Sequence, residues 1–518
     1  MEAREEARTE VLGSRPAHVV GRRLFVRLAG EIGTKSTRTR RRFLRVLARN
    51  ARLALEAAGV RGSVRPEWSR LLVNAAHLPA ARDVLSRVFG VHSVDEVLEV
   101  RFDSLASLVE ALTPLYRDRV AGRSFAVRAR RQGRHDFTSQ DVAVELGAAL
   151  LPFASRVDLE QPEVTVAVEV VDDRAFAVLD SVPGPGGLPL GSGGRAVVLF
   201  SGGFDSPVAA WRVMRRGVRV DLLHCDLGGC GELDQALTVA RELALRWAPG
   251  VEVRAHVVDL TPVVLELIRR VPPRLRQVLL KRAMYRAASR LAELLGAEAV
   301  VTGESLGQVS TQTLRNLAVC EEAATVPVLR PLVGMDKEEI MATARAIGTF
   351  AASAAVQEHC SIATGPVETW AALEEVRAAE RLPQPDLGPE GRPLAEAEAG
   401  DASHPLSEAW IRGAVDRRWV VSLRRWERSG LPEHVVDRVP RDAVVVDVRE
   451  PHEGPPVGDL RLPFSTALDS LETLDRDRTY VLVCTAGVRS EVLARELRAR
   501  GYQAYSLAGG LAALPAGA

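Results

Sequence analysis

The stretch that most constrains this chain is RAVVLFSGGFDSPVAA, residues 195–210. Four apolar residues, 197–200, predict a short buried strand, and the polar turn 201–206 follows it directly. Pro207 stands in the first turn of a predicted helix, where its missing N–H does no harm. A strand, a glycine turn and a helix N-terminus together present converging N–H groups and a positive helix end. The stretch therefore predicts a cradle for an anion.

Composition narrows the class of protein. A chain of 518 residues is too long for one core and predicts about three or four domains. No apolar run is long enough to span a bilayer, and the charged start MEAREEARTE lacks the apolar core of a signal peptide. Five cysteines are too few for a disulfide framework and fit a reducing compartment. We therefore expect a cytoplasmic protein with no membrane partner.

The N-terminal third of the chain predicts an α+β region with two basic segments. A helix expected over 38–58 turns its arginines outward, and the stretch 124–139 alternates apolar and basic residues like a strand before a capped helix. This alternation puts Phe125 on one face of the strand and Arg128 and Arg130 on the other. A basic strand face suits contacts to a phosphate backbone, with a merely solvated arginine surface as the alternative.

The centre of the chain alternates strands and helices, which predicts a parallel sheet with helices on both faces. The expected strands are 197–200, 218–223, 251–258 and 299–302. Ligands bind beyond the carboxyl ends of the strands in such sheets. Four residues follow these strands and are expected at that edge: His224, Cys225, Gly303 and Glu304.

Two segments rich in proline and glycine separate the predicted modules. Residues 183–194 predict a hinge before the central sheet, and residues 382–405 predict a flexible linker after it. Beyond the linker, strands at 443–448 and 480–483 and a helix at 491–500 predict a small α/β module.

A second candidate loop, CTAGVRS at 484–490, follows the last of these strands and opens a helix. Its N–H groups and Arg489 would stabilise a thiolate at Cys484, with a buried structural cysteine as the alternative. Four residues separate Cys484 from Arg489, whereas phosphatase loops have five. The shorter loop resembles that of the rhodanese sulfurtransferases, whose cysteine carries a persulfide. DVR at 447–449 and AGGL at 508–511 match the same family.

The motif SGGFDS is neither a Walker P-loop nor a dinucleotide-binding fingerprint. It resembles the SGGxDS signature of the PP-loop ATP pyrophosphatases, which activate a carbonyl by adenylation. With a basic region in front and a persulfide loop behind, nearly the whole chain resembles the long form of the bacterial tRNA 4-thiouridine sulfurtransferases. The most specific matches are EIGTKSTRTRRRF, FAVRARRQGRHDFTSQ, VTGESLGQVSTQTLRNL and VLRPLVGMDKEEI.

This resemblance implies a multidomain α+β and α/β fold. The implied domains are a ferredoxin-like domain (1–80), a THUMP RNA-binding domain (81–184), a PP-loop ATP pyrophosphatase domain with a doubly wound parallel sheet (195–381), a linker (382–405) and a rhodanese α/β domain with its lead-in (406–518). Members of the family commonly pair, so a homodimer is also an expectation.

The resemblance also implies functional residues. The implied ATP-binding residues are Leu199, Phe200, Ser201, Gly202, Gly203, Asp205, Ser206, His224, Cys225, Lys281, Gly303 and Gln312. The implied catalytic residues are Asp205, Lys337, Cys360, Cys484 and Arg489, with a redox-active disulfide between Cys360 and Cys484. The implied tRNA contacts are Lys35, Arg38, Arg41, Arg128, Arg130, Arg131 and Arg134. Mg²⁺ accompanies ATP, and no fixed protein metal site or prosthetic group is expected. Cys225 stands where the family commonly has an aromatic residue.

The implied reaction forms 4-thiouridine at position 8 of tRNA through an adenylated uridine, with persulfide sulfur from a cysteine desulfurase. A second implied role is sulfur donation to the thiamine thiazole, through a sulfur-carrier protein. Two alternatives stay open: a PP-loop enzyme acting on a small molecule, and a tRNA-binding protein without catalysis. The basic N-terminal region argues against the first, and the intact SGGFDS, Lys337, Cys360 and Cys484 argue against the second.

Overall fold

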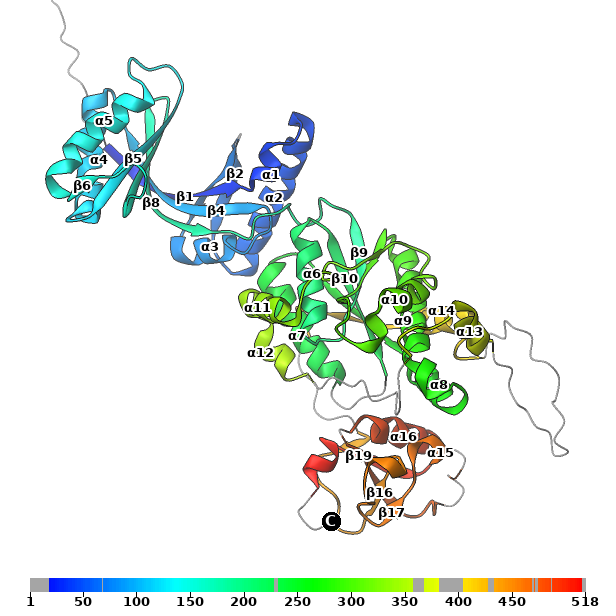
Figure 1. Cartoon of the computed structure of the whole chain (residues 1–518). Helices are drawn as coiled ribbons and strands as arrows, with labels where there is room; N and C mark the ends of the chain where they lie inside the picture. The colour runs from blue at the N-terminus through cyan, green and yellow to red at the C-terminus, as the bar shows by residue number, and fades with distance from the viewer. Residues whose placement is uncertain are drawn as a thin grey trace, which may run out of the picture. The chain divides into compact units, whose positions relative to one another are not determined.

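A computed structural model gives the structure of most of this chain. The residues that it describes are 18–67, 69–227, 232–356, 368–381, 404–426, 433–467, 470, 474–485 and 487–514. They form two compact units, Met1–Pro189 and Leu190–Ala518, which are treated separately below (Figure 1). None of the described helices is both long enough and apolar enough to cross a membrane.

The first unit is built on an eight-stranded sheet with the order β2-β3-β1-β4-β8-β7-β5-β6. Its strands are β1 (His18–Leu28), β2 (Gly62–Pro66), β3 (Arg70–Ala75), β4 (Val91–Arg101), β5 (Ser124–Gln132), β6 (Arg156–Val157), β7 (Val164–Val171) and β8 (Arg174–Pro183). Its helices are α1 (Gly30–Gly33), α2 (Thr37–Ala57), α3 (Leu78–Leu85), α4 (Leu105–Val120), α5 (Ser139–Leu150) and the 3₁₀ helix η1 (Leu151–Phe153). One apolar core lies under α2 and α3, and another lies under α4 and α5.

The long strands β1 and β4 run antiparallel at the centre of this sheet. Sequence patterns do not predict β4, because Asp95 and Glu99 interrupt its apolar residues. Both carboxylates are buried, and arginines of β1 neutralise them: Arg27 pairs with Asp95, and Arg23 pairs with Glu99 at 2.8 Å. A strand interior tolerates buried charges when they are paired in this way.

The two basic segments form the predicted elements. The helix expected over 38–58 is α2, which begins after the capping side chain of Ser36 and buries Phe43 on its inner face. Within the stretch 124–139, the strand is β5, which buries Phe125 and exposes Arg128 and Arg130. The alternation therefore reports these three side chains correctly, but Ala126, on the same face as Arg128, is also buried.

The second unit contains a six-stranded sheet with the order β13-β12-β9-β10-β11-β14. Its strands are β9 (Arg195–Leu199), β10 (Arg219–Asp226), β11 (Arg254–Asp259), β12 (Ala299–Val301), β13 (Val328–Leu329) and β14 (Trp419–Ser422). Its helices are α6 (Asp205–Arg215), α7 (Glu232–Trp247), α8 (Thr261–Arg270), α9 (Pro273–Leu295), η2 (Ser310–Gln312), α10 (Leu314–Glu321), α11 (Lys337–Ile347), α12 (Phe350–Ala354), α13 (Leu373–Glu380) and α14 (Glu408–Asp416). Figure 1 shows α6, α7, α11 and α12 on one side of the sheet and α9, α10, α13 and α14 on the other.

Strands β9 to β13 are parallel, as the alternating pattern predicts, but β14 adds an antiparallel edge that the sequence did not reveal. β14 and α14 belong to the range 406–518 that we expected to accompany the C-terminal module. They fold instead with the central sheet, where β14 pairs with β11 and α14 packs on α9. Arg418 between them donates to Nδ1 of the buried His256 at 3.1 Å. β14 has only four residues, and the pattern of apolar residues in so short a strand does not indicate which sheet the strand joins.

Residues beyond 432 form a C-terminal module with a parallel five-stranded sheet, β15-β19-β18-β16-β17. Its strands are β15 (Val435–Val436), β16 (Val444–Asp447), β17 (Leu460–Arg461), β18 (Thr479–Val483) and β19 (Gln503–Leu507). Its helices are η3 (Pro451–Glu453), α15 (Phe464–Ala467), α16 (Val488–Ala499) and η5 (Gly510–Ala513). The small α/β module predicted beyond the linker is therefore present.

Candidate active site

The glycine turn lies between β9, which ends at Leu199, and α6, which begins at Asp205. The hydroxyl of Ser206 accepts the N–H groups of Ser201 at 3.3 Å and Gly202 at 3.2 Å, which folds the turn over the helix N-terminus. Gly202 has φ +88°, and a Cβ at this position would lie 2.7 Å from Cα of Ala236. Only glycine fits both the left-handed backbone and the close approach of α7.

The ends of three further elements meet this turn. The structure places the other expected residues as follows: His224 and Cys225 at the end of β10, Gly303 directly after β12, Gln312 in η2, Lys281 in α9 and Lys337 at the start of α11. Gly303 is packed so closely that a Cβ there would lie 2.9 Å from the carbonyl carbon of Asp205. The carboxyl edge of the sheet is therefore the candidate site, as expected for a parallel sheet.

Asp205 is the centre of a small polar network. Lys337 Nζ lies 3.2 and 3.5 Å from its two carboxylate oxygens, and Gln308 Nε2 donates to it at 2.9 Å. Lys337 is placed by the N-terminus of α11, where Asp336 and Glu339 form a capping box. The sequence identified Asp205 and Lys337 but not Gln308, which lies in the matched motif VTGESLGQVSTQTLRNL without a separate signal.

Two buried polar atoms beside the turn have no partner in the described residues, Nε2 of His224 and Oε1 of Gln308, and the same holds for Oε1 of Gln312 in the nearby helix η2. The other ring nitrogen of His224, Nδ1, lies 3.1 Å from the carbonyl oxygen of Phe200. Buried polar groups in native proteins are nearly always satisfied, so unpartnered atoms at one site indicate a polar ligand. A purine nucleotide with its phosphates fits this set, because it offers both donors and acceptors beside an N–H cradle.

Lys281 is occupied by the buried carboxylate of Glu304, with 2.9 Å between Nζ and Oε1. Tyr285, Thr302 and Arg330 also donate to Glu304. Burial by itself would raise the pKa of Glu304, but Lys281 and the other donors hold it below its ordinary value. We expected Lys281 to neutralise phosphate charge, but in the structure its ammonium is paired with Glu304.

Cys225 is a poor nucleophile in this environment. Burial, followed by the nearby charge of Asp226, raises the pKa of its thiol to about 12. Cys320 is fully buried, whereas Cys225 is partly exposed, and burial raises the pKa of the Cys320 thiol to about 12. Cys230 and Cys360 lie outside the described residues.

The second loop surrounds Cys484, which is buried at the end of β18. Its sulfur accepts the N–H of Gly487 at 3.1 Å and lies 3.6 Å from the hydroxyl of Ser490. Gly487 has φ +95°, so a glycine is needed to turn the loop into α16. The described part of the loop therefore directs a backbone N–H at the sulfur, as the strand–loop–helix pattern predicts.

Arg489 contacts a carboxylate that the sequence analysis did not identify. Its guanidinium donates two hydrogen bonds of 2.6 Å to Glu453 in η3. Burial opposes the charge of Arg489, but Glu453 and the nearby Cys484 raise its pKa above the ordinary value. This bidentate pair fixes Arg489 beside the loop.

The seven expected RNA contacts are all exposed on the first unit: Lys35, Arg38 and Arg41 at or near the start of α2, and Arg128, Arg130, Arg131 and Arg134 on or just after β5. Two of them also hold neighbouring loops. Arg128 donates to the carbonyl of Leu159, and Arg131 donates to the carbonyl of Gly133 at 3.0 Å.

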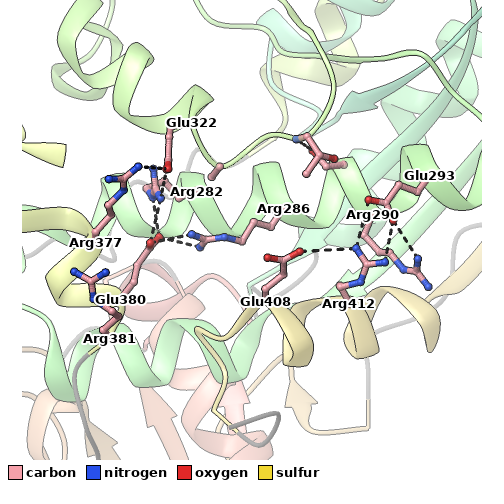
Figure 2. Close-up of a pocket in the computed structure, with 13 residues that line it drawn as sticks. Arg282, Arg286, Arg290, Glu293, Glu322, Arg377, Glu380, Arg381, Glu408 and Arg412 are labelled. Carbon is pink, nitrogen blue, oxygen red and sulfur yellow. Dashed lines mark hydrogen bonds and ion pairs between the residues drawn. The ribbon is translucent and has the colours of Figure 1, made fainter. Parts of the chain in front are cut away.

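A separate cavity of about 320 Å³ lies between α9, α10, α13 and α14 (Figure 2). Figure 2 shows Glu380 between Arg282 and Arg286 and Glu322 facing Arg282. The ion pairs of Glu380 measure 2.7 Å to Arg282 and 2.8 Å to Arg286, and that of Glu322 measures 2.6 Å to Arg282. These carboxylates therefore neutralise Arg282 and Arg286. We interpret this network as a structural tie that holds α13 on α9. In the described residues no group of three or more histidine, cysteine or acidic side chains is arranged to hold a metal ion.

Comparisons with known proteins agree with this geometry. Three family models match the chain: a ferredoxin-like domain of ThiI at residues 23–94, a THUMP domain at 100–180, and "Thiamine biosynthesis protein (ThiI)" at 191–383. The chain is 40% identical over 498 residues to a tRNA sulfurtransferase of Desulfurococcus amylolyticus, which covers 95% of this chain and 98% of that protein. It is 34% identical over 494 residues to a tRNA sulfurtransferase of Pectobacterium atrosepticum, with 93% and 98% covered.

A solved structure is also similar to this chain. The chain resembles a 4-thiouridine synthetase, described as an RNA complex with bound ATP, with a TM-score of 0.65 and 28% identity. The match covers 77% of this chain and 99% of that chain. Similar proteins therefore come from both archaea and bacteria, whereas the motifs had pointed to the bacterial members.

Proposed function

We propose that this chain, which belongs to the tRNA sulfurtransferase family, forms 4-thiouridine at position 8 of tRNA through an adenylated uridine. The chain is an enzyme of ATP-dependent tRNA thiolation. The observation that carries the finer proposal is the set of unpartnered polar atoms around the glycine turn, beside Asp205 and Lys337.

The glycine turn would hold the phosphates of ATP, because its N–H groups and the N-terminus of α6 converge there. Lys337 would neutralise the phosphate charge that develops as pyrophosphate leaves, since its ammonium already lies at Asp205. Asp205 would hold Mg²⁺ against the same phosphates. Adenylation of the uridine O4 is needed because a carbonyl oxygen is a poor leaving group, whereas AMP is a good one.

Sulfur would arrive as a persulfide on Cys484, supplied by a cysteine desulfurase. The terminal sulfur attacks C4, the C4–O bond breaks, and AMP leaves with the electron pair. Cys360 thiolate then attacks the Cys484 sulfur, which forms the Cys360–Cys484 disulfide and leaves sulfur on C4 as the thiocarbonyl. A dithiol reductant supplies two electrons to reset the pair. In the alternative route Cys360 first releases sulfide from the persulfide, and the sulfide attacks C4.

The proposed chemistry assigns a role to each domain of the chain. The domains 1–80, 81–184 and 195–381 remain part of the proposal, with the first two docking tRNA. The range 406–518 is divided, because β14 and α14 belong to the central sheet, and we propose that only the module beyond residue 432 is a rhodanese domain that carries sulfur. Residues 382–403 of the predicted linker lie outside the described residues, and the helices on either side, α13 and α14, both pack on α9, so this segment is not what connects the C-terminal module to the central sheet. Cys484 and Cys360 belong to one chain, and this covalent connection would raise the effective concentration of one thiol at the other. A homodimer and a cytoplasmic location are proposed on the family resemblance.

A second role, sulfur donation to the thiamine thiazole through a sulfur-carrier protein, is favoured by the name of the family model that matches residues 191–383. It would need Cys484 but not the glycine turn, because no uridine is adenylated. A thiazole-forming assay with Asp205→Asn and Cys484→Ala separates the two roles.

The test of the main proposal is a thiolation assay with unmodified tRNA, ATP, Mg²⁺, a cysteine desulfurase and cysteine, scored by mass spectrometry of nucleosides. The wild type should form 4-thiouridine over many turnovers. Cys484→Ala and Cys360→Ala should not form it over repeated turnovers. Cys320→Ala is the matched control, because this buried thiol lies outside both loops. If Cys360→Ala keeps full multiple turnover, the disulfide step is wrong. If the wild type binds tRNA but forms no 4-thiouridine, the glycine turn activates something else.

A further inference from the structure

Trp370 and Leu314 form an exposed apolar pair at the N-terminus of α10. Each side chain is 73% exposed, the highest fraction among the large apolar side chains that the structure describes. Tryptophan has a large apolar surface and is enriched where one molecule binds another. Neither residue has a role in the site described above.

The backbone around Trp370 is fixed rather than loosely held. Residues 368–371 are bound to the first turn of α10 by four hydrogen bonds: Thr313 Oγ1 to Thr369 O (2.8 Å), Asn316 Nδ2 to Glu368 O (2.8 Å), Ala371 N to Asn316 Oδ1 (3.0 Å) and Arg315 Nε to Ala371 O (3.1 Å). Trp370 N also donates to the Glu368 carboxylate at 3.0 Å. The indole is therefore presented to solvent from a preorganised position, which lowers the entropy cost of binding a ligand.

This position is connected to the candidate active site through α10. Gln308 donates to Asp205, and the loop that carries Gln308 closes with a hydrogen bond of 3.0 Å from Gly307 N to Gln312 O, one residue before α10 is capped. Trp370 is therefore bound to the helix that directly follows a loop of the candidate active site.

We infer that Trp370, supported by Leu314, stacks on an unpaired nucleobase of the tRNA next to the uridine under reaction. This inference rests on the proposed function. A base must leave its stack to reach an adenylating site, and this step exposes flat faces on the base and its neighbours. Aromatic side chains bind such faces whatever the base. Arg315 is exposed beside the pair and provides a cation for the adjoining phosphate.

A nucleobase fits this surface better than the C-terminal module of the same chain. In the described part of that module the only large apolar side chain that is exposed is Leu460, at 38%. The module therefore offers little apolar surface to cover an indole, whereas every base has a π-face.

The experiment compares full-length wild type, Trp370→Ala and Trp370→Phe. KM and kcat for tRNA are measured in the thiolation assay, and tRNA affinity is measured separately. Trp370→Ala should lower kcat/KM about 5- to 100-fold, mainly through KM, and Trp370→Phe should restore most of it. The control Trp419→Ala removes another exposed indole, 53% exposed on β14, and should stay within about twofold of wild type.

The inference is overturned if Trp370→Ala behaves as wild type, or if Trp370→Phe is as impaired as Trp370→Ala. The inference is also overturned if Trp370→Ala keeps normal tRNA affinity and a normal KM and loses only the sulfur transfer that depends on the desulfurase. Trp370 would then bind a protein partner. If the wild type forms no 4-thiouridine, the proposed function has failed, and the tRNA affinities alone then decide whether Trp370 stacks on RNA.

Discussion

Gly303 lies against Asp205 so closely that a Cβ on the glycine would be 3.0 Å from Cβ of Asp205 and 2.9 Å from its carbonyl carbon. The same Cβ would lie 3.0 Å from the backbone nitrogen of Ser206. Two of these three contacts are to backbone atoms and the third is to Cβ, so none can move aside without displacing the turn. The end of β12 therefore sets the position of the glycine turn, and glycine is required at 303.

The first prediction follows from this contact. Gly303→Ala should lower the rate of ATP-dependent AMP formation about 100-fold, because a shift of the turn by a fraction of an ångström misaligns the phosphates. The measurement is AMP release with saturating tRNA. Gly30→Ala is the control, since a Cβ at Gly30 meets nothing within 4 Å. An unchanged rate in Gly303→Ala would mean that the turn does not hold the nucleotide.

Lys337 tests the electrostatic part of the site. Lys337→Met should lower AMP formation about 10²- to 10³-fold, because it removes the ammonium 3.2 Å from the Asp205 carboxylate. Lys337→Arg should recover only part of the rate, since a planar guanidinium does not replace a compact ammonium. The exposed neighbour Glu338→Gln is the control. A normal rate in Lys337→Met, with tRNA binding intact, would contradict this role.

A structural feature could be predicted from the sequence only where the residues that cause it lie close together in the chain. The turn at 201–206 was predictable because its glycines, its preceding strand and its helix start are contiguous. β4 could not be predicted, because the buried charges of Asp95 and Glu99 are stabilised only by arginines of β1, more than 60 residues away in the chain. The pairing of Arg489 with Glu453 was hidden for the same reason.

The ion-pair network of the cavity in Figure 2 predicts a stability effect. Arg282 is 1% exposed and bonds Glu322, Glu380 and the carbonyl of Val319. Arg282→Met should lower the free energy of unfolding by about 3–5 kcal/mol, because it removes a buried cation and leaves the half-buried Glu380 with less compensation. Urea unfolding followed by tryptophan fluorescence measures this. Arg412→Met removes a more exposed cation and should change the midpoint little. Equal effects of the two variants would contradict a structural role for the buried network.

Glu304 predicts a pH dependence of stability. Its pKa in the folded chain is held below the ordinary value of 4.5, so its contribution is complete above that value and is lost as pH falls through the lower folded pKa. Glu304→Gln should therefore be less stable than wild type at pH 7, by about 3–5 kcal/mol, and the difference should shrink at acid pH. Unfolding curves at pH 7, 4 and 3 measure this. A difference that stays constant over this range would show that the charge of Glu304 is not what matters.

The basic face of β5 predicts how tRNA affinity depends on salt. Arg130 is exposed and projects from the face opposite buried Phe125, so it is positioned to neutralise one phosphate. Arg130→Ala should reduce the slope of log K against log salt by about 0.7–0.9 and weaken binding most at low salt. Arg500→Ala, an exposed arginine of the C-terminal module paired with Glu496, is the matched control and should leave the slope unchanged. If the slopes of Arg130→Ala and wild type coincide, this strand face is a solvated surface, and the RNA contacts must be sought on α2.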